Sequence, residues 1–308
     1  MRRLIATVPV MAVVAVFVFS LLYLSPGDPA AVIAGDLASG EDIAKIRAKL
    51  GLDRPFLVQF WSWLWALMQG DLGVSIFSNL PVTRLIGQRL EPTQALSVTT
   101  MVFAIVFAVP MGVIAAWKAG SWIDRSIMAL AVLGFSFPVF VLGYLLIFAF
   151  AVKLEWLPVQ GYVPIAKGFK PFIESIILPT LALGMIYIAL IARMTRASVL
   201  EVLSEDYVRT AHAKGLAPER VLLGHALKNA AVPIVTTIGI GVALLIGGVV
   251  VTESVFAIPG LGRLTVDAIL RRDYPIIQGV ILVFSGVYVL INLAVDIIYT
   301  FLDPRIRY

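Results

Sequence analysis

Six apolar runs without a charged residue divide this chain. A helix needs about 20 apolar residues to cross the roughly 30 Å of hydrocarbon in a bilayer. We expect the fourth run, which is short, to extend at both ends, and the sixth to continue past Asp296 to Leu302. The pattern predicts an all-α integral membrane protein with six transmembrane helices, which cover residues 4–24, 92–117, 126–152, 175–192, 229–252 and 274–295.

The first run follows Arg2 and Arg3, so two interpretations compete. A cleaved signal peptide also has a basic start, but its apolar region usually spans only about 7–15 residues. The run from Leu4 to Leu24 is longer than that. We therefore expect an uncleaved first transmembrane helix within residues 1–24.

Basic residues indicate the orientation, because short cytoplasmic loops of membrane proteins carry an excess of lysine and arginine. With the N-terminus inside, 12 of the 24 basic residues fall on the cytoplasmic side and six in the other short loops. The remaining six lie in the long segment 25–91, which carries little weight because long loops cross largely regardless of charge. Both termini are therefore predicted to be cytoplasmic.

The long outer segment contains two expected helices. Glu41–Leu50 has apolar residues at helical spacing and is followed by Gly51, a residue type that often ends helices. Phe56–Met68 follows Pro55 and is rich in tryptophan. Indole rings favour the membrane interface, but packing within a small external helical cap would also account for them. The sequence leaves both interpretations open.

The last outer segment, residues 253–273, contains a turn motif. The stretch 258–264 reads IPGLGRL, in which Pro259, Gly260 and Gly262 predict a tight turn. The sequence on either side is compatible with short re-entrant or interfacial helices. We treat these three residues as a candidate external gate.

A charged segment, residues 206–233, joins the fourth apolar run to the fifth. Asp206–Lys214 is predicted to form a short helix, in which Ala211 and Ala213 leave a slim surface. Gly215 is expected to end this helix, and Pro218 suits the first position of a second one. Such a segment either docks a soluble partner or is a solvated connector, and the residues alone leave both possibilities open.

Composition narrows the function classes. Hydrophobic residues make up 60% of the chain and charged residues 14%, against roughly 25% charged in soluble domains. The net charge is +5, but the basic residues form no continuous patch, which argues against nucleic-acid binding. The sequence has no cysteine and no motif of a zinc protease, a serine hydrolase or a P-loop ATPase, which disfavours an intramembrane enzyme. His212 and His225 are expected to be structural.

Asp296 is the one ionisable residue that we expect to be a buried charge within the membrane, in a structural role. A secondary transporter driven by protons or sodium usually has more than one such group near the midplane, so that alternative class is disfavoured. Four glycines of the fifth run would allow close helix packing or a bend, and we expect packing, at Gly239, Gly241, Gly247 and Gly248.

The charged segment resembles the EAA loop of ABC-importer permeases, whose coupling helix enters a cleft on the ATPase subunit. Arg209-Thr210-Ala211 occupies the place of Glu-Ala-Ala, Gly215 that of the family's glycine and Leu227-Lys228 that of Leu-Pro, so the pattern's glutamate and proline are absent. The variant R-T-A-x-A-K-G after S-E-D-Y is similar to the branch that imports dipeptides, oligopeptides, glutathione and nickel. Further similar segments follow in the family's order at residues 24–30, 50–55, 70–75, 255–264 and 302–308.

The resemblance covers essentially the whole chain and implies the type I fold of ABC-importer permeases, with an external helical segment between the first two transmembrane helices. It implies an N-terminal helix in residues 1–24, a periplasmic segment 25–91, and a core domain 92–308 that contains the coupling loop 198–228. It also implies one cluster of ATPase-coupling residues, namely Asp206, Tyr207, Arg209, Thr210, Ala211, Ala213, Lys214 and Gly215.

A permease of this family would be a multi-pass protein of the bacterial inner membrane that does no bond-breaking chemistry and binds no cofactor. The resemblance implies a homologous second permease, two ATPase subunits that bind ATP and Mg²⁺, and a periplasmic or lipid-anchored substrate-binding protein as partners, besides membrane lipid. Short peptides are the expected cargo. Glutathione, nickel or another small solute stays an alternative, because the binding protein chiefly selects the substrate.

Overall fold

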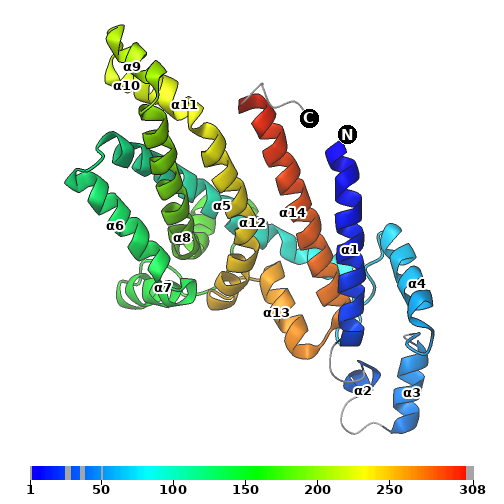
Figure 1. Ribbon diagram of the computed structural model, residues 1–308. Helices are drawn as coiled ribbons and strands as arrows, with labels where there is room; N and C mark the ends of the chain where they lie inside the picture. The colour runs from blue at the N-terminus through cyan, green and yellow to red at the C-terminus, as the bar shows by residue number, and fades with distance from the viewer. Residues whose placement is uncertain (1, 25–28, 35–38, 50, 303–308) are drawn as a thin grey trace. The chain divides into compact units, whose positions relative to one another are not determined.

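The computed structural model describes residues 2–24, 29–34, 39–49 and 51–302 (Figure 1). Within these residues the regular structure is helical, apart from an isolated antiparallel bridge between Val74 and Pro81. The all-α prediction is confirmed. The chain divides into two compact units: unit 1 comprises residues 1–91 and 260–290, and unit 2 comprises residues 92–259 and 291–308.

Four long apolar helices coincide with four of the predicted runs. Each is long and apolar enough to cross a membrane. The fourth run is extended at both ends and the sixth continues to Leu302, as expected, whereas the helix of the second run begins ten residues earlier than its apolar part. These helices are α5 (Val82–Trp117), α8 (Phe169–Leu203), α12 (Ala231–Val255) and α14 (Tyr274–Leu302).

The third apolar run is a bent pair instead of one straight helix. Helix α6 (Trp122–Ser136) and the helix formed by α7 (Val139–Leu146) with its π-helical continuation η1 (Ile147–Lys153) meet at 100°. The cause is Pro138, which disfavours a helical conformation in the residue before it. Phe137 accordingly has φ −90° and ψ 129°, which ends α6.

The number of spans stays a prediction at six. The four long helices become five if the bent pair is one span. The remaining candidate is α1 (Arg2–Leu24), in which the described residues Thr7–Leu21 form a shorter apolar helix.

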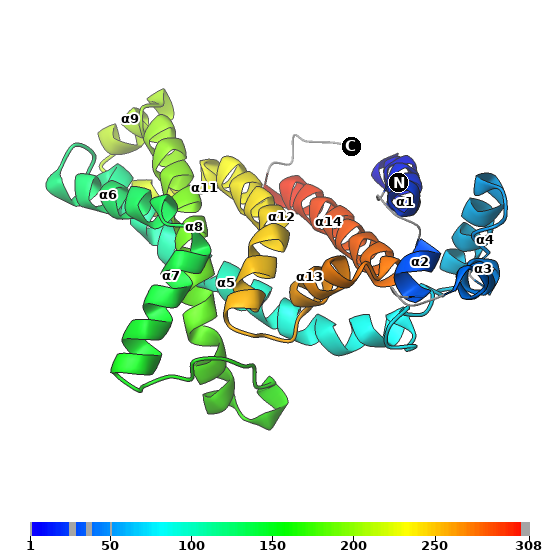
Figure 2. The ribbon, with the colours of Figure 1, turned by 90° about the horizontal axis from the view of Figure 1, so that it is seen from below.

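Unit 2 is organised around α8. This helix packs against α6, α7 and α12, and Figure 2 shows α7 and α12 running beside it. The α5–α8 contact is close: a Cβ atom added at Gly112 would lie 2.6 Å from Cβ of Thr195 and 2.7 Å from the carbonyl oxygen of Ala192. The core of unit 2 contains large, fully buried apolar side chains, among them Leu96, Ile176, Leu178, Leu183, Ile191, Leu245 and Ile258.

The glycines of α12 act mainly as packing residues. An added Cβ would lie 2.6 Å from Val295 at Gly239, 3.4 Å from Tyr187 at Gly241 and 2.7 Å from Leu183 at Gly248. These three positions confirm the prediction of close helix packing. No heavy atom lies within 4 Å of a Cβ added at the fourth glycine, so the prediction is wrong for Gly247.

Unit 1 contains α1, three short helices of the long outer segment and α13 (Leu261–Arg271), together with the first turns of α5 and α14. The short helices are α2 (Pro29–Ala34), α3 (Gly40–Lys49) and α4 (Phe56–Met68). The left-handed φ of +67° at Gly51 follows the end of α3, as expected from the sequence.

Helix α4 packs on α1 through aromatic rings. Phe19 lies at the centre of the cluster, 5.3 Å from the ring of Trp63 and 5.4 Å from that of Phe60. By contrast, Trp61 and Trp65 are both 63% exposed. One tryptophan therefore has the packing role that the sequence allowed, and two have the exposed position expected of interfacial residues.

Candidate functional site

The charged segment forms a short helix whose end is fixed by a glycine. Helix α9 (Asp206–Ala213) is followed by Lys214 and by Gly215, which has φ +80°. The Gly215 N–H donates to the carbonyl of His212 at 2.9 Å, and the Leu216 N–H donates to that of Ala211 at 3.3 Å. These two bonds are those of a Schellman motif, in which a left-handed residue ends the helix. The prediction that Gly215 ends the helix is confirmed.

A second helical stretch leads from this turn to α12. Pro218 occupies the first position of α10 (Pro218–Arg220), and Glu219 lies in its first turn, as predicted. A π-helical turn, η3 (Val221–Ala226), and α11 (Leu227–Asn229) follow before α12 begins. Figure 1 shows α9, α10 and α11 gathered at one end of α8 and α12.

The inner face of α9 packs against a small, separate apolar cluster. Val208 and Ala211 pack there with Val221, and the partly buried Leu203 and Leu216 complete the cluster. Ala211 is only 8% exposed, so the expectation that it contributes to the outer surface is wrong. The small side chain lets α9 lie close to η3, a packing role that the sequence alone does not distinguish from a slim surface.

The outer face of α9 carries the other residues of the predicted coupling cluster. Asp206 and Arg209 form an exposed ion pair at 3.3 Å, of the kind that contributes little to stability. The hydroxyl of Tyr207 accepts a hydrogen bond of 2.8 Å from the side-chain amide of Asn229, which ties α9 to α11. The residues of the cluster with exposed side chains or backbone are Asp206, Tyr207, Arg209, Thr210, Ala213, Lys214 and Gly215.

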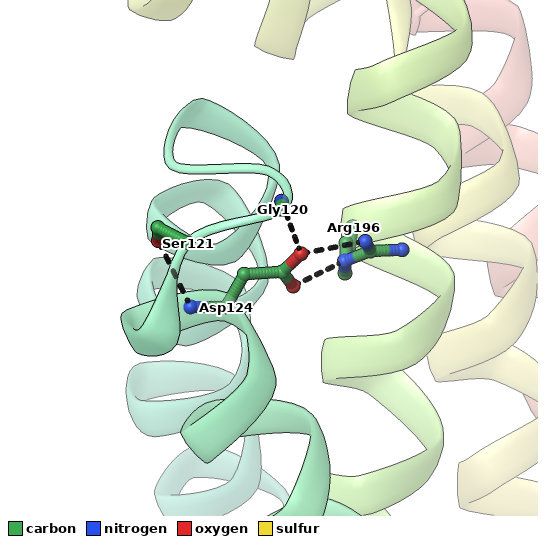
Figure 3. Close-up of polar contacts among 4 residues, drawn as sticks. All are labelled: Gly120, Ser121, Asp124 and Arg196. Atoms are coloured by element: carbon green, nitrogen blue, oxygen red, sulfur yellow. Dashed lines mark hydrogen bonds and ion pairs between the residues drawn. The ribbon is translucent and has the colours of Figure 1, made fainter.

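A buried ion pair lies between α6 and the final turns of α8 (Figure 3). Arg196 donates from Nε to Oδ1 of Asp124 at 2.6 Å and from Nη2 to Oδ2 at 2.8 Å. The Gly120 N–H donates to Oδ2 at 2.9 Å, and the Ser121 hydroxyl oxygen accepts from the Asp124 N–H at 3.4 Å. A bidentate pair of this geometry is among the stronger polar contacts in proteins.

This ion pair joins α6 to the helix that leads into α9, and the sequence does not predict it. In the sequence, Arg196 is one of the predicted cytoplasmic charges, and Asp124 lies just before an apolar run. The available signal was local: Ser121 three residues before Asp124 is the spacing of a helix N-cap, which placed Asp124 in the first turn of a helix. Nothing local pointed to Arg196, 72 residues away.

The role of Asp296 as a charge within the membrane stays a prediction, and three acids outside that prediction are more deeply buried. Asp296 is half-buried in α14, whereas Glu253, Asp124 and Asp273 are 0%, 4% and 2% exposed. Each of these three acids lies at or next to a helix end and has polar partners. Glu253, for example, accepts a hydrogen bond of 2.5 Å from the hydroxyl of Thr93. Hydropathy alone predicts that charges at the ends of apolar runs are exposed, whereas packing against other parts of the chain buries these three acids.

The predicted external turn contains two of the three residues that were expected in it. Helix α12 ends at Val255 and α13 begins at Leu261, so Gly262 lies inside a helix. Pro259 and Gly260 lie in the connection, where Gly260 has an extended backbone that any residue can adopt, and the left-handed residue is Ala257 at φ +50°. The expectation of a helix beside the turn is confirmed by α13.

Two family models together match nearly the whole chain. Residues 108–308 match the model described as "Binding-protein-dependent transport system inner membrane component". Residues 1–97 match the model for the N-terminal part of the same kind of membrane component. The charged segment and the buried ion pair both lie within the first of these matches.

Full-length relatives have similar sequences. A probable peptide ABC transporter permease from Sinorhizobium fredii is 56% identical over 308 residues, which cover 100% of this chain and 98% of that protein. A putative peptide transport system permease from Brucella abortus is 46% identical with the same coverage. A glutathione transport system permease from Escherichia coli is 47% identical over 307 residues, again covering 100% and 98%.

A solved structure has a related fold. A chain from inward-facing structures of the MetNI methionine ABC transporter matches with a TM-score of 0.59 at 20% identity, and the match covers 71% of this chain and 96% of that one. At this identity the likeness is one of fold. From the two family models and these relatives, this chain belongs to the family of binding-protein-dependent transport system inner-membrane components.

Proposed function

We propose that this chain is the permease subunit of an ATP-driven importer and forms one half of the pathway for short peptides across the bacterial inner membrane. Two relatives of at least 46% identity are named as peptide permeases, and their full-length match supports this cargo. A relative of similar identity is named as a glutathione permease, so glutathione is the second candidate. Glutathione is itself a short peptide, and the two candidates share most of their chemistry.

The proposal assigns energy coupling to α9. The observation that carries it is how this helix is held in place. The helix is short and its outer face is exposed, yet three separate sets of contacts fix its position. Its inner face packs on a dedicated core, Tyr207 is bonded to Asn229, and the Schellman motif at Gly215 ends it. A solvated connector needs none of these devices. An element that receives force from a partner needs all of them, because a loose helix would absorb the displacement.

The buried ion pair would transmit a displacement of α9 to helix α6. A shift of α9 acts on Leu203 at the end of α8 through their shared core. Arg196 lies two turns earlier in α8, where it holds Asp124 and therefore the start of α6. Helix α6 leads to the bend at Phe137 and Pro138 and on to α7. Movement at α9 would thus reach the bent helix pair.

The partners and the orientation follow from this assignment. Helix α9 has to face the cytoplasm, so both termini are cytoplasmic, residues 25–91 are periplasmic and the core domain 92–308 contains the coupling loop 198–228. A homologous second permease completes the pathway. Two ATPase subunits hold ATP and Mg²⁺ and perform the hydrolysis, and a periplasmic or lipid-anchored protein delivers the substrate. This chain acts as a non-catalytic subunit.

Site-specific crosslinking tests where the ATPase docks. The natural chain has no cysteine, so a single cysteine at Ala213, labelled with a photoreactive maleimide, gives one defined position. We expect that position to capture the ATPase subunit in membranes, because Ala213 lies on the outer face of α9. The matched control is a cysteine at Ala211, two residues away, which packs inward and should react poorly.

Capture of lipid or of the second permease alone from Ala213 would show that the docking surface lies elsewhere. Equal capture of the ATPase from Ala211 would contradict the burial of that face. Immunoblots against the ATPase and the permease identify the products in each case.

A further inference from the structure

Unit 1 contains a cavity of about 260 Å³ that the coupling mechanism does not use. Its walls come from the loop around Ser75, the start of α5, helix α13 and the start of α14. The volume is slightly below the roughly 300–1,000 Å³ of ordinary small-molecule pockets, so it has room for a ligand of one or two amino-acid residues.

One wall of the cavity is held rigidly. The carboxylate of Asp273 accepts a hydrogen bond of 2.6 Å from the hydroxyl of Ser75 and one of 3.3 Å from the N–H of Ile76. The Ser75 hydroxyl oxygen accepts from the Ser78 N–H at 3.1 Å, and the Ser75 N–H donates to the carbonyl of Leu80 at 2.9 Å. The buried acid thus organises the loop, and its oxygen atoms already have donors.

The rest of the lining combines apolar contacts with charges of both signs. Leu85, Leu264 and Ile276 supply apolar surface. Arg271 and Asp267 line the cavity from α13, and Arg89 lines it from α5. Residues four apart on a helix share a face, yet Asp267 and Arg271 form no ion pair among the described residues. Two exposed charges of opposite sign are therefore available at the same cavity.

We propose that this cavity binds one short peptide with free termini, with its carboxylate at Arg271 and its ammonium group at Asp267. A guanidinium group matches a carboxylate through paired N–H donors, and a carboxylate is the natural partner of an ammonium group. The apolar surface accommodates a small side chain. A zwitterionic dipeptide uses all of these features. A purely anionic solute would instead bring a second negative charge close to the carboxylate of Asp267.

The site rests on the proposed function and deepens it, since it gives the permease a peptide-recognition site of its own. The test uses the purified permease–ATPase complex in lipid nanodiscs, without any substrate-binding protein. Radiolabelled alanyl-alanine is the probe, and unlabelled glutathione serves as a competitor. We expect saturable binding of the dipeptide, and competition by glutathione shows whether both compounds occupy the site.

Charge-removing variants locate the ligand. Loss of a charged hydrogen bond weakens binding by roughly ten- to a hundredfold, so we expect that effect for Arg271→Gln and for Asp267→Asn. The matched control is Arg84→Gln, an exposed arginine of α5 that does not line the cavity, and it should bind alanyl-alanine normally. Alanyl-alanine amide should lose its sensitivity to Arg271→Gln, and N-acetyl-alanyl-alanine its sensitivity to Asp267→Asn.

Absence of saturable binding by the intact complex would overturn the inference, as would equal binding by Arg271→Gln and Arg84→Gln. If Arg271→Gln instead weakens capture of the substrate-binding protein while free peptide does not bind, the cavity holds a side chain of that protein and the inference is wrong. ATP-driven peptide uptake that persists in either case would leave the proposed function intact. Retained ATPase activity of each variant complex shows that the fold is preserved.

Discussion

Replacing Gly215 with valine should abolish peptide uptake while leaving the permease in the membrane. Gly215 has φ +80°, a conformation that costs an L-residue about 1–2 kcal/mol and suits a β-branched residue least. No heavy atom lies within 4 Å of a Cβ added there, so the effect comes from the backbone and not from crowding. Valine would drive the residue out of the left-handed region and break the hydrogen bonds that end α9.

The measurement is uptake into proteoliposomes, together with the amount of permease in the membrane from immunoblots. Gly215→Asn is the rescue variant, because asparagine tolerates the left-handed conformation better than other side chains do. Gly224→Ala is the matched control, since Gly224 lies in the same segment without a positive φ and has open space at the position of an added Cβ. Normal uptake by Gly215→Val would mean that the geometry of this turn is not needed for coupling.

Removing the arginine of the buried ion pair should strongly destabilise unit 2. Arg196→Ala leaves the Asp124 carboxylate, whose side chain is 5% exposed, with the Gly120 N–H as its remaining hydrogen-bond donor among the described residues. Breaking such a pair costs about 3–5 kcal/mol, and we expect the lower end because the Arg196 side chain is 30% exposed. The midpoint of thermal unfolding in detergent should fall by several degrees.

Two comparisons isolate the ion pair from a general effect of mutation. The double variant Asp124→Ala with Arg196→Ala should be more stable than Arg196→Ala alone, because no unpaired charge then stays buried. Lys170→Ala removes the exposed ion pair with Glu174, whose side chains are 87% and 41% exposed, and should change stability by less than about 1 kcal/mol. Similar unfolding midpoints for Arg196→Ala and Lys170→Ala would contradict the assigned role.

Local sequence signals predicted the local features of the fold well. Apolar runs located the long helices, Gly215 and Pro218 marked the turn between α9 and α10, and Gly51 marked the end of α3. The bend at Pro138 also had a local cause, but an uncharged run on both sides suggested a single straight helix. Hydropathy indicates that a segment lies in an apolar environment, but it does not indicate where the helix axis bends.

Features that depend on residues far apart in the chain could not be read in this way. Asp124 meets Arg196 across 72 residues, and Asp273 meets Ser75 across 198. Nothing in the sequence near an acidic residue reports which distant helix covers it. The burial of Ala211 was missed for a related reason, because alanine is equally suited to a slim exposed surface and to a close internal contact.

The energy source of transport tests the proposed function most directly. The permease, its second permease and the ATPases are reconstituted into proteoliposomes with the substrate-binding protein, and uptake of radiolabelled alanyl-alanine is measured with the ion gradients dissipated by an uncoupler. We expect uptake that requires ATP on the side of α9 and persists in the presence of the uncoupler. Uptake that continues without ATP and follows an imposed proton gradient would contradict the assignment of this chain to an ATP-driven importer.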